Sequence, residues 1–228
     1  NADGGAMNRG TLRTLTAAFC VDPNQTRFTA TQYNDALDLA SQQFAMDSKA
    51  LFKDASTITV VDGTSAYSLP TDFMYELKVT HKLLKLEPIS RETLEYYIRS
   101  EDWTAKTGTP RYFIIDPEEA RKQIKLYPIP TANDAGANLI LTYYPLPAAM
   151  TADSDTPLNS SALMAQFHTA LACYAAWLIL NYETASPDVA AKRQKLLDQY
   201  NDKVTEARDT FGNTKSEPLR LRGGRYWK

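Results

Sequence analysis

The sequence has few of the residue patterns that carry chemistry. It contains only two cysteines and two histidines in 228 residues. Patterns typical of serine hydrolases, zinc proteases, P-loop nucleotide sites and dinucleotide-binding sites do not occur in it. Cys20 and Cys173 lie in apolar segments without CxxC spacing, so we interpret them as small buried hydrophobic residues. We therefore expect no metal and no cofactor.

The histidines and paired acids are weak candidates for catalysis. His81 ends an alternating pattern and is typical of an ordinary sheet residue, whereas His168 lies in an apolar helical segment, which favours a hydrogen-bonded core or interface histidine. Glu118 and Glu119 fall in a turn, where adjacent carboxylates usually form a solvated tip. Thirteen tyrosines, many in strand segments, favour core and protein-interface positions, and they leave a carbohydrate-active enzyme or a glycan-binding protein as an alternative.

The sequence also lacks a strong charge of one sign and a long membrane-like run. Its formal charge is −2 in total, but residues 213–228 carry +4 and the rest −6. The most apolar stretch, residues 163–180, contains Gln166, His168 and Thr169, which favours a buried helix over a membrane span. We expect no secretion, no membrane partner and assembly in a reducing compartment. Met7 is a candidate native start, so we expect residues 1–6 to be an artificial leader.

The first third of the chain predicts two helices. Residues 8–19 form a short amphipathic pattern. The second helix is predicted over about residues 30–50, because Thr29 is a good N-cap with Gln32 three residues later. Phe28 is placed to pack on Tyr33 across this cap. One face of the second helix is predicted to be buried, through Tyr33, Leu37, Ala40 and Phe44.

Between residues 56 and 146 the pattern changes to the two-residue period of strands. We predict about six strands in a meander, forming a small antiparallel sheet or sandwich with one face covered by helices. A short helix capped by Ser90 interrupts the strands and runs to about Ile98. In the clearest strand one face is predicted to be buried, through Phe73, Tyr75, Leu77 and Val79.

Helical patterns return after a linker at residues 145–157. Residues 160–182 are apolar nearly all round, which predicts a central helix contacted on several sides. Ser186 and Pro187 mark the start of the last helix, which ends near Gly212. On these two helices we predict the residues that pack the bundle or a contact between copies: Phe167, Leu171, Tyr174, Trp177, Leu197, Tyr200, Val204 and Phe211.

The predicted fold class is therefore α+β. It consists of an α-helical bundle with an inserted antiparallel β-sheet or sandwich subdomain and an extended C-terminal tail. We predict these boundaries: 7–55 for the N-terminal helices, 56–146 for the β-rich insertion, 158–212 for the C-terminal helical hairpin and 213–228 for the tail.

The tail combines basic and aromatic residues without an amphipathic period. Aromatic residues beside arginines are typical of interface anchors, and alternating leucine and arginine is typical of an added strand. A disordered solubilising end and weak nucleic-acid binding are the alternatives. We predict docking to a protein through Leu219, Arg220, Leu221, Arg222, Arg225, Tyr226 and Trp227.

Three runs also carry a resemblance: TGTPRYFIIDPE, IKLYPIPTANDAGANLILTYYPLPAAMTADSDTPLN and the helix FHTALACYAAWLILNY. In this order they resemble the phage adaptor proteins found between portal and tail, including the tail tubular protein A-like adaptors of short-tailed phages. The likeness covers about residues 28–212. Its motifs are architectural and contain no catalytic residue.

The resemblance implies a structural virion protein at the head–tail junction, assembled in the host cytoplasm. It implies a ring, commonly of twelve copies, beneath the portal protein and above tail nozzle or tail tube proteins. DNA would pass through the lumen without sequence-specific binding, and the C-terminal segment would reach the portal. A ring also fits our expectation that the apolar helices exceed what a thin bundle can bury. A neck protein lower in the assembly, such as a stopper, is an alternative.

Overall fold

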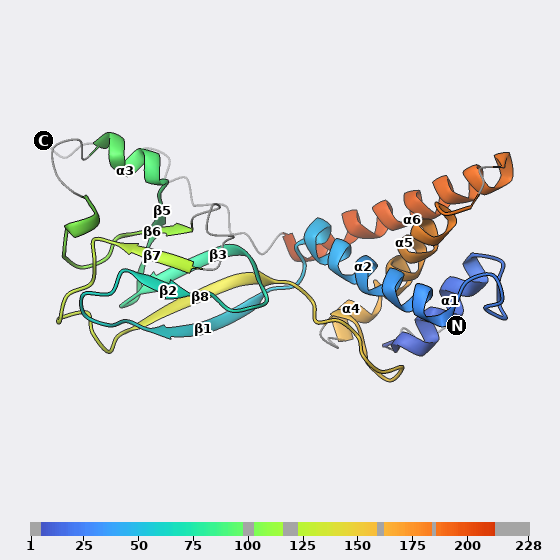
Figure 1. The fold of residues 1–228 in the computed structure, drawn as a ribbon, viewed down its shortest axis with the longest axis horizontal. Helices are drawn as coiled ribbons and strands as arrows, with labels where there is room; N and C mark the ends of the chain where they lie inside the picture. Colours follow the sequence, from blue (N-terminus) through green and yellow to red (C-terminus); the bar gives the residue numbers. More distant parts are fainter. Residues whose placement is uncertain (1–5, 98–102, 116–122, 159–161, 184–185, 213–228) are drawn as a thin grey trace, which may run out of the picture. The chain divides into compact units, whose positions relative to one another are not determined.

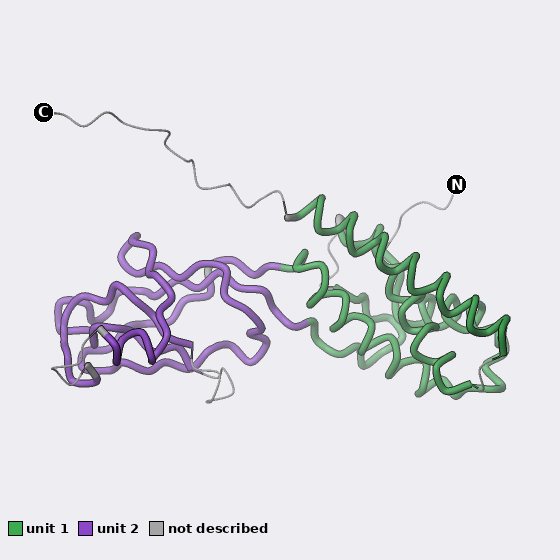
Figure 2. Tube along the Cα trace, turned by 90° about the horizontal axis from the view of Figure 1, so that it is seen from above, with its two compact units in different colours: residues 1–51, 147–228 green, residues 52–146 purple. Residues whose placement is uncertain are grey.

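The protein consists of helices and β-strands in two compact units (Figures 1 and 2). The computed structural model describes residues 6–97, 103–115, 123–158, 162–183 and 186–212. One unit contains Asn1–Leu51 and Pro147–Lys228 and is helical, whereas the other, Phe52–Leu146, is mainly β-stranded. The predicted α+β class is confirmed. Among the helices described, none is long and apolar enough to cross a membrane.

The helical unit is organised around a central apolar helix. Its described helices are α1 (Arg9–Phe19), α2 (Ala30–Ser48), α4 (Ala162–Ala165), α5 (His168–Leu180) and α6 (Pro187–Gly212). Helix α5 contacts α1, α2 and α6, and most of its residues are buried. The prediction of a central helix contacted on several sides is therefore confirmed.

The prediction of one continuous helix over residues 160–182 is wrong. The described part is broken after Ala165, and Phe167 precedes α5 with φ −98° and ψ −2°. The Phe167 ring is fully buried, with its centroid 5.8 Å from that of Phe44 and 6.1 Å from that of Phe211. Because the backbone turns at this point, a large ring can enter the core instead of lying along a helix surface.

Local capping interactions begin the helices where the sequence predicts. Helix α2 has a complete capping box, in which the Thr29 side chain accepts from the Gln32 backbone and the Gln32 side chain accepts from the Thr29 backbone. Asn8 caps α1 by accepting from the Thr11 backbone N–H. Ser186 accepts from the Val189 backbone N–H at the start of α6, 3.3 Å away. The predicted buried face of α2 is also confirmed.

The β-stranded unit contains two four-stranded sheets among its described residues. The first has the order β1 (Lys53–Thr59), β8 (Asn138–Pro145), β3 (Phe73–His81), β4 (Leu84–Lys85). The second has the order β2 (Ala66–Ser68), β7 (Gln123–Tyr127), β6 (Tyr112–Ile115), β5 (Glu87–Pro88). The predicted meander is wrong, because the chain moves between the sheets and β5 is parallel to β6. Buried residues of both sheets form one hydrophobic cluster, so each sheet covers the apolar face of the other.

Strand β3 does not bury the face predicted for it. Val79 is fully buried, but Tyr75 and Leu77 are each 40% exposed. The pairing of β3 with β8 shifts register between Phe73 and Tyr75 and again between Glu76 and Lys78. Since a one-residue shift moves side chains to the opposite face, the simple alternation of the sequence is lost.

Short helices accompany the second sheet. Helix α3 (Arg91–Tyr97) is preceded by Ser90, whose hydroxyl accepts from the Thr93 backbone N–H at 3.1 Å. Leu94 of α3 forms a small hydrophobic cluster with Ile114 and Tyr127 of the sheet. Helix α3 therefore covers part of the second sheet, as predicted for a helix in this region, and a 3₁₀ helix η1 (Trp103–Ala105) follows.

Candidate interaction surfaces

The eight packing residues predicted on the last two helices meet in the core of the helical unit. Phe167, Leu171, Tyr200 and Val204 are at most 4% exposed. The other four are partly buried against the same core: Tyr174, Trp177, Leu197 and Phe211. These residues pack α5 and α6 within one chain, and a role between copies stays a prediction.

Tyr200 joins three helices of this core. Its ring centroid lies 4.6 Å from that of Tyr174 on α5, and its hydroxyl donates to Asp47 of α2 at 2.7 Å. Arg208 of α6 also donates to the Asp47 carbonyl at 2.7 Å. Burial, and then the hydrogen bond to Asp47, raise the pKa of the Tyr200 phenol. A buried phenol with a carboxylate acceptor therefore fixes α6 to the end of α2.

The expectation that these helices carry more apolar surface than one chain buries is wrong for α5. Its neighbours α1, α2 and α6 cover it, and its larger residues Tyr174 and Trp177 are also partly buried. Exposed large apolar residues of the helical unit lie elsewhere, at Val21, Leu39, Met46 and Tyr182. The α5 surface is therefore used largely within the chain.

Two turns at one end of the helical unit are held together by charge. Arg27 follows α1 and forms an ion pair with Glu183, which follows α5. The exposed apolar residues Val21 and Tyr182, 67% and 87% exposed, lie in these same two turns. This end thus presents two large apolar side chains on linked turns.

A buried carboxylate organises the α1–α2 turn. Asp22 is 3% exposed and accepts hydrogen bonds from the backbone N–H groups of residues 26–28 and from the Tyr33 hydroxyl. Burial opposes ionisation, but these hydrogen bonds outweigh it and lower the pKa of Asp22 to about 2. The carboxylate satisfies the free N–H groups before α2 and so fixes the turn.

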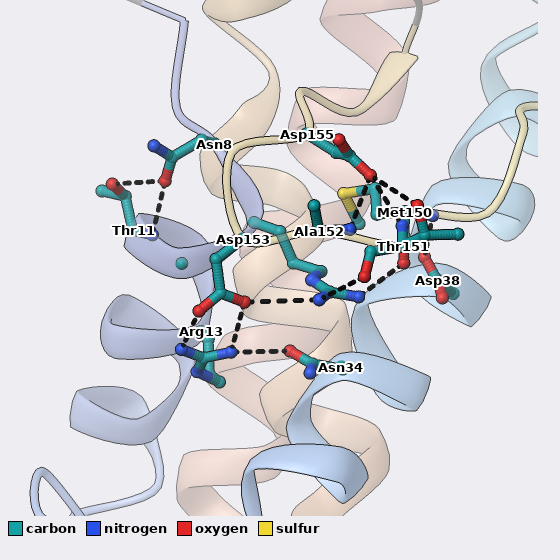
Figure 3. A network of polar contacts seen from close by, with 12 residues as sticks. Asn8, Thr11, Arg13, Asn34, Asp38, Met150, Thr151, Ala152, Asp153 and Asp155 are labelled. Carbon is teal, nitrogen blue, oxygen red and sulfur yellow. Dashed lines mark hydrogen bonds and ion pairs between the residues drawn. The ribbon is translucent and has the colours of Figure 1, made fainter.

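A second polar network holds residues 150–155, which belong to the segment that returns from β8 to the helical unit (Figure 3). Asp153 accepts two hydrogen bonds from Arg13, at 2.7 and 2.6 Å, and one from Arg9 at 3.3 Å. The Arg13 hydrogen bond lowers the pKa of the Asp153 carboxyl. On the other side of the segment, Asp38 of α2 accepts from the Met150 backbone N–H. The returning segment is therefore bound to both α1 and α2.

One buried polar cluster of the β-stranded unit lies where the β3–β4 turn meets residues 131–134, and this end of the unit is called the tip. Asp134 is fully buried and accepts from Lys82 Nζ at 2.9 Å and from the Thr131 hydroxyl at 3.0 Å. The buried His81 lies with Nε2 3.4 Å from the same carboxylate. Burial opposes ionisation of Asp134, but these partners, Lys82 first, lower its pKa to about 2. Beside this cluster, Leu83 is 94% exposed.

A groove of about 340 Å³ lies at the adjoining edge, where the chain passes from β4 to β5. Four of its lining residues are apolar or aromatic, and three are charged. They are Leu84, Leu86, Pro110 and Tyr112, with Lys85, Glu87 and Arg111. The lining is therefore mixed, with apolar and aromatic residues in a small majority.

His168, like His81, is buried and contacts other residues of the chain. His168 begins α5, is fully buried and accepts the Met7 backbone N–H on Nδ1 at 2.9 Å. Burial lowers its pKa. The interpretation of His168 as a hydrogen-bonded core histidine is confirmed. In the described part of the chain, His, Cys, Asp and Glu side chains form no group of three or more that is arranged to hold a metal ion.

The match to a known family covers both units. The chain matches the family model described as SU10 adaptor protein over residues 7–222. It belongs to the SU10 adaptor family. The predicted resemblance to phage head-to-tail adaptors is therefore confirmed. No curated protein matches the chain.

As a member of the SU10 adaptor family, the protein is a phage structural protein. Membership of this family implies interaction with portal and tail components. The acidic pair Glu118 and Glu119 lies outside the described residues. The predicted docking residues of the tail also lie outside them: Leu219, Arg220, Leu221, Arg222, Arg225, Tyr226 and Trp227.

Proposed function

We propose that this SU10 adaptor family member forms a ring of twelve copies beneath the portal. In this proposal the ring links capsid to tail and surrounds the DNA exit channel at the head–tail junction, after assembly in the host cytoplasm. The observation that carries the proposal is the family match, which spans both the helical and the β-stranded unit. The structural roles of His81 and His168 give no support to an enzyme or a glycosidase.

The two units divide the work in this proposal. The α-helical bundle, residues 7–55 and 158–212, builds the ring, and the sandwich-like insertion, residues 56–146, contacts a partner. The core shared by α1, α2, α5 and α6 supports a rigid ring-building element. The common core of the two sheets supports an insertion that keeps its own shape.

The ring contact is proposed on the outer face of α2. Leu39 and Met46 are seven residues apart, so they lie on one face of the helix, and they are 55% and 37% exposed. A ring requires that this face meet a different face of the next copy. Replacing both with serine should abolish the ring but leave the helical content unchanged. Val21→Ser, at an exposed apolar residue in the α1–α2 turn, is the matched control and should assemble normally.

The tail, residues 213–228, is proposed to dock the portal. Mass photometry of the protein with the portal of the same phage tests this with the full chain and with a chain that ends at Asn213. The full chain should add to the portal with ring stoichiometry, and the shortened chain should not. A full-length variant with Arg220, Arg222 and Arg225 changed to lysine separates charge from geometry, because lysine keeps the charge but loses the bidentate contacts. If the full chain binds no portal, the proposal fails.

DNA is proposed to slide through the ring without sequence-specific binding. The charge of −6 outside the tail would repel the phosphate backbone. The assembled ring should therefore elute freely from immobilised duplex DNA at physiological salt. Retention under these conditions would contradict this part of the proposal.

A stopper lower in the neck remains the competing structural function. Its expected behaviour differs in one measurement, since a stopper would bind a tail tube component and leave purified portal unbound. Parallel titrations against both proteins decide between the two.

A further inference from the structure

The turn between β3 and β4 has an unfavourable sequence for its backbone. Thr80 faces Lys85 and His81 faces Leu84, so Lys82 and Leu83 form a two-residue hairpin turn. Both have positive φ, 48° and 67°. Hairpin turns of this kind favour Gly, which has no Cβ, and Asn, whose short polar side chain tolerates the left-handed region; other side chains are strained there. Neither Lys nor Leu is a residue that the turn itself would select.

Leu83 is unfavourable for a second reason, which is its exposure. The side chain is 94% exposed, so it contributes almost nothing to the core of the β-stranded unit. A strained backbone that holds an apolar side chain in water stabilises the free protein neither locally nor through packing. Strain of this kind is a recognised sign of a functional position.

Contacts of the neighbouring Lys82 hold the turn in place. Lys82 Nζ donates to the Asn133 carbonyl at 2.6 Å and to the buried Asp134 at 2.9 Å. Asp134 pairs with the Lys82 charge, so the more exposed side chain of the turn is the apolar Leu83. Val61, which follows β1, and Leu84, which begins β4, are 53% and 65% exposed.

The tip lies at the end of the unit away from the connections to the rest of the chain. Thr59 pairs with Asn138 and His81 pairs with Leu139, so β1 and β3 end where β8 begins. The chain enters at the start of β1 and leaves at the end of β8, at the opposite end of this sheet. A tip in this position is free to contact another protein.

We propose that Leu83 is an anchor that inserts into an apolar pocket of a tail component, while the groove beside β4 and β5 receives an apolar side chain of the same partner. The proposal rests on the adaptor function proposed above. The groove is lined by Leu84, the residue next to the anchor. Two copies joined through such adjacent features would form a closed two-fold pair, whereas a ring needs two different faces. Residues 213–228 are proposed above to dock the portal. We therefore take a component of the phage tail as the partner of this tip.

The test compares three full-length proteins: the wild type, Leu83→Asn and Leu83→Met. Asparagine tolerates positive φ, so Leu83→Asn should raise the Tm by roughly 2–4 °C. The same variant should bind the purified tail nozzle or tail tube protein of the phage roughly tenfold more weakly or worse. Leu83→Met keeps a large apolar side chain and should bind within about threefold of the wild type. Portal binding and ring stoichiometry should be equal in all three.

A gain in stability together with a loss of binding is the expected signature, because a structural residue would lose stability when replaced. If Leu83→Asn binds the tail component as tightly as the wild type, the anchor is refuted while the adaptor function stands. If Leu83→Asn instead loses the portal or the ring, the choice of partner is refuted. If the wild type binds neither portal nor tail component, the adaptor function itself fails.

Discussion

Removing the Tyr200 hydroxyl should weaken the helical unit without disturbing its shape. Tyr200→Phe keeps the ring that packs on Tyr174 and Phe44 and deletes only the donor to Asp47. Tyr200→Ala removes the ring as well. The pair of variants separates the hydrogen bond that joins α6 to α2 from the packing that fills the core.

The magnitudes follow from burial. A hydrogen bond to a charged group contributes about 1.5–3 kcal/mol, and the partly exposed Asp47 recovers some hydration when its donor is lost. We therefore expect Tyr200→Phe to lower the free energy of unfolding by about 1–2 kcal/mol. Deleting a buried aromatic ring costs about 3–5 kcal/mol, so Tyr200→Ala should be the clearly weaker protein.

Urea unfolding followed by far-UV circular dichroism measures both changes, with an unchanged m-value as the sign that the folded state is preserved. Tyr182→Phe is the matched control, because Tyr182 is 87% exposed and its variant should differ from the wild type by less than about 0.5 kcal/mol. The reasoning is refuted if Tyr200→Phe unfolds like the wild type, or if it is as unstable as Tyr200→Ala. Should Tyr200→Ala not fold, Tyr200→Phe alone still decides the hydrogen bond.

Three further predictions concern the same unit. Thr29→Ala removes one half of the capping box and should cost about 0.5–2 kcal/mol in urea unfolding, whereas Thr29→Ser should be close to neutral. Because burial lowers the pKa of His168, its contribution is complete above pH 6.5 and is lost as the pH falls; the Tm should drop more between pH 7.5 and 5.5 in the wild type than in His168→Asn, which keeps an acceptor for Met7. Asp153→Ala releases the two arginines it binds, and since this carboxylate is half-exposed the loss of stability in urea unfolding should be small and should shrink in high salt. A loss in Asp153→Ala that is independent of salt would contradict the ion-pair interpretation.

The sequence predicts best those parts of the fold that depend on neighbouring residues. Thr29 and Gln32 form their capping box within one turn of helix, and the buried face of α2 follows from spacing alone. The apolar stretch around Leu171 likewise indicates a central helix, because each side of it needs a partner. In these cases local chemistry and tertiary packing favour the same structure.

Features that depend on distant partners were not predictable in this way. The two register shifts of β3 arise against β8, about 65 residues later, so Tyr75 and Leu77 look buried in sequence but are exposed. The order of strands across two sheets is also set by their shared core. Between β3 and β4, the Lys82-Leu83 turn lacks the Gly or Asn that marks a hairpin, so the sequence does not indicate the positive φ angles that the structure shows there.

The discontinuous helical unit has a consequence for synthesis. The Met7 backbone N–H donates to His168, and Arg13 donates to Asp153, about 140–160 residues further along the chain. Helices α1 and α2 also pack on α5, so both helices lack their partners until that later part has been synthesised. At ordinary translation rates of 5–20 residues per second, the two helices would spend roughly 7–32 s outside the ribosome with an uncovered apolar face. The β-stranded unit, which is continuous in sequence, can fold during this interval. We therefore expect a nascent chain to fold its β-stranded unit before its helical core, which is complete only after α6 has been synthesised.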